Sequence, residues 1–299
     1  MEVILAVSGG VDSVAMLHSL AHGDGFAEDD FTDIIVAHFD HGIRTDSSAD
    51  ARFVAELAKR HGLRFELATV ELGQAVNEAD ARKARWDFLN SMQDKYQAPI
   101  ATAHHADDVF ETQIINLLRG SGRRGLSVLR NSSVLKRPLI NRSKEEIYDY
   151  ACLHKLEFVE DSTNHDMKHL RNRVRNIYIP KLGDNQKLNQ LIIEVVDINS
   201  KLESELSAVY DQVVLRKDGK LMFSRNEMIN LDRKVLGEIF RKGFDDLNVI
   251  HQKQKIQRHT IELLTDFAKR KDSNKMHDIS KNIKAKLTKT HLELIVVDK

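Results

Sequence analysis

Residues 3–17 read Val-Ile-Leu-Ala-Val-Ser-Gly-Gly-Val-Asp-Ser-Val-Ala-Met-Leu, and this stretch decides the fold. Five consecutive apolar residues, Val3–Val7, are typical of a parallel strand that is buried on both faces. Val14, Leu17 and Leu20 follow at the spacing of one helical face. The segment Ser8–Ser13 therefore lies between a strand and a helix.

Three more strands are predicted in the first half of the chain, at residues 33–39, 64–70 and 99–104. Stretches with apolar residues at helical spacing separate them, around residues 53–57, 84–92 and 109–118. Strands that alternate with helices predict a doubly wound, Rossmann-like α/β fold with a parallel sheet.

The pattern changes after this sheet. Ser143–Glu146 is a capping box that opens a helix through about His154, Pro180 interrupts the chain, and Asn189–Val214 predicts a long helix. We expect a catalytic domain at residues 1–182, a helical connector at 183–215 and a small C-terminal domain at 216–299. That last domain is expected to be mainly helical and to finish in the strand-like Leu292–Val297.

Composition narrows the class of protein. The chain is 41% hydrophobic and 30% charged, as expected of a globular protein, and no stretch approaches the ~18 apolar residues of a membrane span. Without a basic leader, a cytoplasmic protein with no membrane partner is expected. Cys152 is the only cysteine, which excludes an internal disulfide and a cysteine-ligated cluster.

The formal net charge of zero hides an asymmetry. Residues 118–182 carry 14 Lys and Arg against 7 Asp and Glu, whereas residues 1–117 carry 9 against 20. A basic segment of this kind favours a polyanionic partner. Ordinary variation of charge along a chain is the alternative.

The segment Ser8–Ser13 has the composition of a phosphate-binding loop. Two glycines let backbone N–H groups approach an anion, two hydroxyls add donors, and the following helix directs its positive end there. The segment is neither a Walker A loop nor a GxGxxG fingerprint. Asp12 would repel a phosphate unless a divalent cation lay between them, so Asp12 is a candidate Mg²⁺ contact. A plain turn is the alternative.

Two further motifs precede residue 100. His38–Arg44 follows the second strand, where doubly wound folds place ligands, and Arg44 is suited to a phosphate or carboxylate. Its two histidines are more typical of loop positioning than of a metal pair. Glu78–Arg85 lies on a helix, where Arg82 is either a ligand contact or half of a solvated ion pair.

His104–Asp108 follows the fourth strand and contains two imidazoles and two carboxylates. These groups are suited to Mg²⁺ binding or to proton transfer. Asp107 or Asp108 as a simple helix N-cap is the alternative. Leu117–Gly122 then gives a second glycine-rich turn, which carries Arg119.

Ser8–Ser13 matches the SGGxDS signature of PP-loop ATPases. The ordered set of motifs, strong over residues 1–182 and weak beyond, resembles the tRNA(Ile)-lysidine synthetase family. The matching stretches are Ser8–Ser13, His38–Arg44, Glu78–Arg82, Thr102–Thr112, Leu117–Gly122, Arg137–Leu139, Glu160–Asn164 and Arg171–Arg175.

The resemblance implies a reaction on an isoleucine tRNA with a CAU anticodon. ATP would adenylate the wobble cytidine, and free L-lysine would then displace AMP, which changes the tRNA from methionine to isoleucine identity. ATP and Mg²⁺ are the implied cofactors, and a homodimer is possible because related enzymes are commonly dimers.

The resemblance also implies roles for individual residues. The implied ATP-binding residues are Ser8, Gly9, Gly10, Val11, Asp12, Ser13, Arg82 and Arg119, with Asp12 also on Mg²⁺. The implied catalytic residues are Asp12, Asp40, His104, His105, Asp107 and Asp108, and the implied tRNA-binding residues are Arg171, Arg173 and Arg175.

Three alternatives remain open. A PP-loop tRNA thiolase shares the ATP chemistry but generally needs more cysteines than Cys152, and an amidotransferase-type synthetase usually brings a glutaminase domain. A degenerate nucleotide-binding module would hold tRNA without modifying it, although such a module has no need of Asp12 or of His104–Asp108.

Overall fold

A computed structural model describes residues 1–29, 31–40, 42, 47–70, 78–129, 131–159, 170–181, 186–217, 220–251, 257–270, 272–280 and 283–296. The chain forms two compact units, Met1–Val196 and Asp197–Lys299, and each is described by itself. No helix in the described ranges has both the length and the apolar character that a membrane crossing requires.

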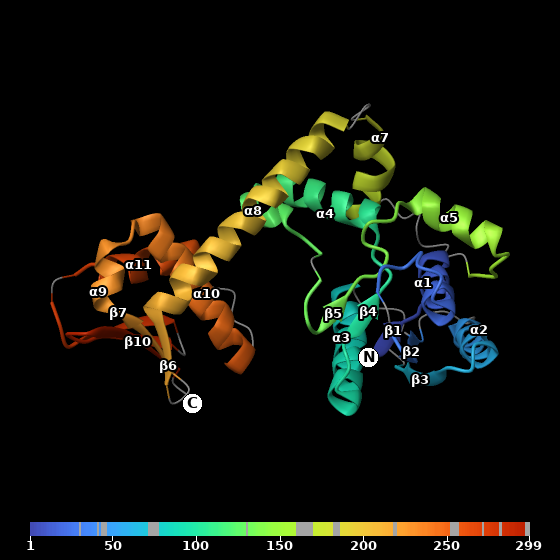
Figure 1. Cartoon of the computed structure of the whole chain (residues 1–299), viewed down its shortest axis with the longest axis horizontal. Coiled ribbons are helices and arrows are strands. Elements are labelled where there is room, and N and C mark those ends of the chain that lie inside the picture. Colours follow the sequence, from blue (N-terminus) through green and yellow to red (C-terminus); the bar gives the residue numbers. More distant parts are fainter. Residues whose placement is uncertain are drawn as a thin grey trace. The chain divides into compact units, whose positions relative to one another are not determined.

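The N-terminal unit is built on a five-stranded parallel sheet, which confirms the predicted doubly wound fold (Figure 1). The strand order is β3-β2-β1-β4-β5. The strands are β1 (Glu2–Ala6), β2 (Asp33–Asp40), β3 (Arg64–Thr69), β4 (Ile100–Thr102) and β5 (Leu135–Lys136). The central strand β1 is buried at Val3, Ile4 and Leu5, as its uninterrupted apolar sequence predicts.

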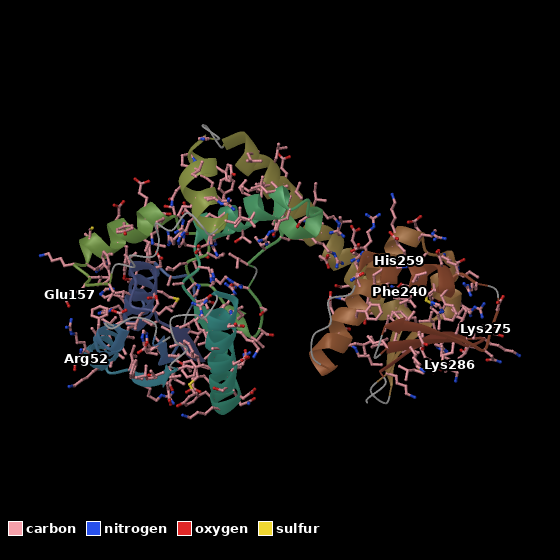
Figure 2. All side chains as sticks on the ribbon, turned by 180° about the vertical axis from the view of Figure 1, so that it is seen from behind. Arg52, Glu157, Phe240, His259, Lys275 and Lys286 are labelled. Carbon is pink, nitrogen blue, oxygen red and sulfur yellow. The ribbon has the colours of Figure 1, made fainter. Side chains whose placement is uncertain are left out.

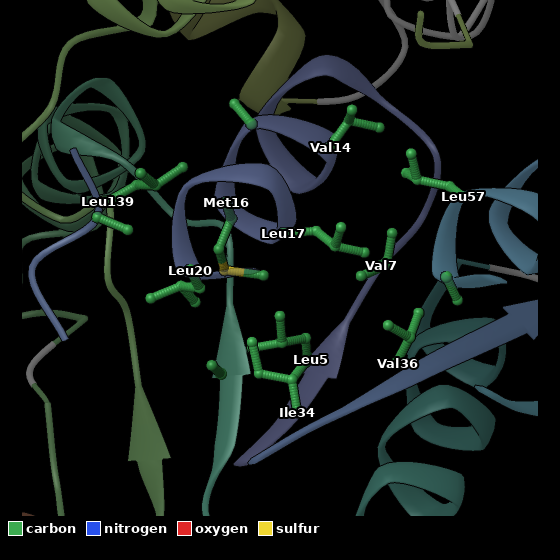
Figure 3. Close-up of a cluster of buried hydrophobic side chains, with 14 of the residues drawn as sticks. Leu5, Val7, Val14, Met16, Leu17, Leu20, Ile34, Val36, Leu57 and Leu139 are labelled. Carbon is green, nitrogen blue, oxygen red and sulfur yellow. The ribbon is translucent and has the colours of Figure 1, made fainter. Parts of the chain in front are cut away.

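Helices cover both faces of this sheet. They are α1 (Val11–His22), α2 (Ser47–Arg60), α3 (Glu78–Tyr96), α4 (Ala106–Leu118) and α5 (Lys144–Leu153). Leu5 and Val7 pack with α1 residues such as Leu17 in one buried cluster (Figure 3). Ile4, whose side chain points to the other face, packs with Leu89 of α3 in a second cluster. Each fully buried leucine of this kind contributes about 1.5–3 kcal/mol.

The topology determines where a ligand site can form. Strand β1 lies between β2 and β4, so the strand order reverses there, and doubly wound sheets bind ligands outside the carboxyl ends of their strands at such a point. The segments after β1, β2 and β4 all leave the sheet at this edge. Ser8–Ser13 and His104–Asp108 belong to these segments, and Asp40 is the last residue of β2 at the same edge.

A second helical segment follows α5. It consists of α6 (Leu170–Arg173), a π-helical turn η3 (Val174–Tyr178), α7 (Ile179–Lys181) and α8 (Gln186–Val213). Pro180, where the sequence predicts an interruption, lies inside α7. The bounds of α8 are close to those predicted for the long helix. The division between the two units falls within α8. The motif Glu160–Asn164 lies outside the described residues.

The C-terminal unit combines helices with an antiparallel sheet of strand order β6-β7-β10-β9-β8. The strands are β6 (Val214–Lys217), β7 (Lys220–Ser224), β8 (Lys275–Ser280), β9 (Ile283–Leu287) and β10 (His291–Val296), and the helices are α9 (Arg225–Asn230), α10 (Arg233–His251) and α11 (Arg258–Ala268). Figure 2 labels Phe240, which belongs to the buried core of this unit, and Lys275 and Lys286 on β8 and β9.

The helices and the final strand of this unit agree with the sequence, which did not predict the other four strands. In β9, buried Ile283, Ala285 and Leu287 alternate with Lys284 and Lys286. Such a short, half-polar strand has no long apolar run, and its pairing with β8 and β10 leaves no local signal that distinguishes it from polar helix or loop sequence.

Candidate functional site

The loop Ser8–Ser13 adopts a tight turn from β1 into α1. Gly9 has a φ of 94°, a backbone conformation that L side chains rarely adopt, so this position favours glycine. Gly10 is the N-cap residue of α1, and Val11 is buried in the core. Val11 thus offers a ligand only its backbone.

Hydrogen bonds within the loop place several donors together. Ser13 Oγ lies 3.2 Å from the backbone nitrogens of both Ser8 and Gly9, which donate to it, and it donates to the Gly10 carbonyl at 2.9 Å. Two successive N–H groups therefore point at one oxygen atom at the N-terminus of α1. This arrangement is suited to an anion.

The end of β2 lies next to this loop. His38 Nδ1 donates to the Val7 carbonyl at 2.7 Å, which supports its interpretation as a loop-positioning residue. Asp40, on the same face of β2, is buried and accepts from the Gly42 N–H at 2.8 Å. His41 and Arg44 of this motif lie outside the described residues.

His104–Asp108 passes from β4 into α4. His105, rather than either aspartate, is the N-cap residue, and its N–H donates to Asp108 Oδ2 at 3.2 Å. Asp107 Oδ2 accepts from the backbone N–H of Lys144 at 2.8 Å. The His105 imidazole, whose Nδ1 lies 3.4 Å from Asp107 Oδ2, and the hydrogen bond from Lys144 hold the pKa of Asp107 below its usual value, against the opposing effect of burial.

His104 occupies the most positive part of the site. Its Nδ1 lies 2.8 Å from Thr102 Oγ1. Burial lowers the pKa of His104 to about 4; Asp108 opposes this effect, and Arg137, Arg171 and Arg85 reinforce it. His104 is therefore neutral at physiological pH.

Two of the three predicted tRNA-binding arginines are bound to carboxylates of the protein. Arg171 Nε donates to Glu111 Oε2 at 2.9 Å and Arg171 Nη2 to Asp108 Oδ1 at 2.8 Å. Arg175 donates to both oxygens of Glu111, the longer bond being 3.1 Å. The side chain of Glu111 is only 2% exposed. Arg173, by contrast, is exposed.

The local backbone explains this division. Arg171 lies on α6, and Arg175 lies four residues later on the π-helical turn η3. Both are on the same face of this helical segment, and both side chains contact α4. π-helical turns are rare and often occur at functional sites. Arg173 lies on another face of this helical segment.

The two remaining predicted ATP-binding residues occupy different positions. Arg82 is exposed on α3 and close enough to Arg85 to lower the pKa of that guanidinium, an effect second to burial. Arg85 in turn lies near His104. Arg119 follows the last residue of α4, roughly 18 Å along the helix axis from Asp107.

Three residues of the site were missed in the sequence: Glu111, Arg85 and Lys144. Glu111 lies inside the motif Thr102–Thr112 and Arg85 inside Glu78–Arg85, so spacing on a helix face was the available signal. Lys144 Nζ lies 2.6 Å from Asp12 Oδ1. Its only local signal was its place directly after the cap residue Ser143.

The expected Mg²⁺ requires oxygen ligands at this site. Among the residues that the structure describes, no group of three or more His, Cys, Asp and Glu side chains could hold a metal ion. Mg²⁺ in nucleotide sites often uses one or two carboxylates plus substrate phosphates. Asp12, partly exposed beside the loop, fits this second mode as a single carboxylate ligand.

The site and the fold define a class of protein. The PP-loop domain family matches residues 1–182, which contain the whole sheet and every site residue described above. The chain belongs to this family.

Particular relatives narrow the comparison. The chain is 37% identical over 200 residues to the tRNA(Ile)-lysidine synthase of Wolbachia pipientis wMel, which covers 62% of this chain and 44% of that protein. It is 31% identical over 269 residues to the tRNA(Ile)-lysidine synthase of Thermosipho africanus, which covers 86% of this chain and 61% of that one. The chain thus spans about half the length of the relatives it matches.

A solved structure supports the fold. A U34-tRNA thiolase from Methanococcus maripaludis superposes with a TM-score of 0.50 at 18% identity, covering 68% of this chain and 72% of the thiolase chain. At this identity the likeness concerns the fold alone.

Proposed function

We propose that the chain is an ATP-dependent tRNA-modifying ligase, a tRNA(Ile)-lysidine synthetase. It would ligate lysine to the wobble cytidine of an isoleucine tRNA with a CAU anticodon, through an adenylated cytidine, and release AMP and pyrophosphate. One observation carries the proposal: the anion-binding loop after β1 and the histidine–aspartate block after β4 lie at one sheet edge in a chain whose relatives are named for this reaction.

The first step is adenylation. The N–H groups of Ser8 and Gly9 and the N-terminus of α1 would bind the pyrophosphate of ATP. Mg²⁺ held by Asp12 would neutralise phosphate charge. The oxygen on the cytosine 2-position attacks the α-phosphorus, and the bond from that phosphorus to the pyrophosphate breaks. Buried Asp40 would position the neighbouring loop through its bond to Gly42.

The second step needs a neutral lysine amine. The nitrogen forms a bond to cytosine C2, the bond from C2 to the AMP oxygen breaks, and one proton leaves the nitrogen. The carboxylates of Asp107 and Asp108 would attract the incoming ammonium group, which loses one proton to bulk water before it attacks. His104, which is neutral at pH 7, would accept the proton that leaves the nitrogen when the new bond forms. His105 holds both carboxylates in place from within 3.5 Å.

Contacts with tRNA would come from exposed basic groups. Arg173 is exposed, and residues 200–299 carry 21 Lys and Arg against 15 Asp and Glu. Phosphate contacts of this kind lose affinity as salt rises. Arg171 and Arg175 would instead shape the pocket through Glu111 and Asp108.

The test is an AMP-release assay with the full chain and a transcript of isoleucine tRNA that carries a CAU anticodon. AMP release that requires ATP, lysine and this tRNA together is the expected result. Release without any need for lysine would indicate another PP-loop modifying enzyme. No release at all would indicate a binding module.

A further inference from the structure

Lys144 connects two parts of the candidate site from a third segment. It is the first residue of α5, and its backbone N–H donates to Asp107 Oδ2 at 2.8 Å. Its ammonium group donates to Asp12 Oδ1 at 2.6 Å. A single residue thus contacts the loop after β1 and the block after β4.

The start of α5 holds this residue firmly in place. Ser143 Oγ accepts from the Glu146 N–H at 3.1 Å, and Glu146 Oε2 accepts from the Ser143 N–H at 2.7 Å. This capping box fixes the first turn of the helix. The position of Lys144 therefore depends on the cap and on Asp107, and not on its pair with Asp12.

The charges at the loop Ser8–Ser13 favour a phosphate as a second partner of the Lys144 ammonium group, besides Asp12. Asp12 lies in the first turn of α1, beside the N–H groups that would bind pyrophosphate. A carboxylate there repels phosphate, and Lys144 neutralises it in the absence of ATP. An ammonium on a flexible stem is also a common phosphate ligand, with three donors that can turn from one anion to another.

We propose that Lys144 binds the β- and γ-phosphates of ATP, and that its ammonium moves from Asp12 to these phosphates when ATP–Mg²⁺ binds. Asp12 is then released to the cation. This assignment rests on the proposed ATP site at Ser8–Ser13. The simple alternative is that Lys144 acts only as the counter-charge of Asp12.

A double-mutant cycle separates the two roles. The probe is the Mg²⁺ complex of α,β-methylene ATP, titrated calorimetrically into the full chain without tRNA or lysine, with AMP as a second probe. The proteins are the wild type, Lys144→Met, Asp12→Asn and the double variant. Lys144→Gln gives the same comparison if methionine at this position unfolds the chain, and Lys59→Met on α2 is the matched exposed control.

Lys144→Met should weaken binding of the ATP analogue by roughly 10-fold or more, in the wild-type and in the Asp12→Asn background alike. Binding of AMP should change by no more than about 2-fold, since AMP has no β- or γ-phosphate. Lys144→Arg, which keeps the charge, should restore most of the affinity.

If Lys144→Met does not weaken binding of the ATP analogue in the Asp12→Asn background, Lys144 acts only as a counter-charge and the assignment is overturned. An equal loss of AMP affinity would overturn it as well. A wild-type chain that binds no analogue would overturn the ATP site itself. Wild-type affinity in Lys144→Met would overturn only the role of Lys144.

Discussion

At the scale of single residues, the site is organised by one buried carboxylate. Glu111 accepts hydrogen bonds from both Arg171 and Arg175, which come from a segment some 60 positions later in the chain. The motif that contains Glu111 was visible in the sequence. Its partners were not predictable, because no local pattern relates two arginines on one helix to a glutamate on another.

Glu111→Gln should therefore destabilise the N-terminal unit. An amide cannot accept two charged donors as a carboxylate does, so we expect the free energy of unfolding to fall by roughly 1–3 kcal/mol. Urea denaturation followed by circular dichroism measures this. Glu145→Gln, at an exposed position on α5, is the control and should change stability by less than about 0.5 kcal/mol. Equal effects of the two substitutions would contradict the buried arrangement.

Substitutions of Arg173 and of Arg175 should have different effects, the first on tRNA binding and the second on stability. Arg173→Ala should weaken tRNA binding and reduce the salt slope of the binding constant by about 1, because it removes one phosphate contact. Arg175→Ala should lower stability through Glu111. Filter binding of the tRNA at several salt concentrations measures the slopes. An unchanged slope in Arg173→Ala would identify this residue as part of a solvated helix face.

At the scale of elements, the apolar runs made the parallel sheet predictable. Val3–Val7 and residues 33–39 became β1 and β2 because strands buried on both faces show no alternation. The strand β9 alternates lysine with buried residues, whereas residues 275–278 of β8 are exposed, and both strands resemble polar helix or loop sequence locally. The π-helical turn η3 likewise has no local signal in the sequence.

A cluster of histidines near α1, α2 and α5 predicts that the stability of the N-terminal unit depends on pH. The ring of His18 lies within 4.2–5.8 Å of those of His22, His61 and His154, and its Nδ1 lies 2.7 Å from the Tyr150 hydroxyl. Burial, then the neighbouring imidazoles, lower the pKa of His18 to about 4, against the opposing effect of Asp24.

Stability should fall as the pH drops from about 6.5, the unfolded pKa of His18, towards 4, because only the unfolded chain binds the proton in this range. The change is measured as urea unfolding at pH 7 and pH 5. His154→Phe keeps a ring beside Tyr150 and removes one of the imidazoles that lower the pKa of His18, so its loss of stability on acidification should be smaller. His104 contributes with the same sign in both proteins and cancels in this comparison. Equal losses would contradict the coupling.

At the scale of the whole molecule, the candidate site lies in the N-terminal unit, and an excess of Lys and Arg occurs both in residues 118–182 of that unit and in residues 200–299. Residues 1–182 match the PP-loop domain family, and the sequence motifs lie entirely within them. The order of these motifs made the site predictable, since the topology of a doubly wound sheet brings the carboxyl ends of β1, β2 and β4 to one edge. The excess of Lys and Arg in residues 118–182 and 200–299 favours a polyanionic partner.

The most direct test of the proposed function is the chemical identity of the product. The full chain is incubated with ATP, isotopically labelled lysine and the isoleucine tRNA with a CAU anticodon, and the digested nucleosides are analysed by mass spectrometry. We predict that the wobble cytidine gains labelled lysine with loss of one water, and that Asp12→Ala gives no such product and no pyrophosphate. An unmodified cytidine with the wild-type chain, or near-normal turnover by Asp12→Ala, would contradict the proposed function.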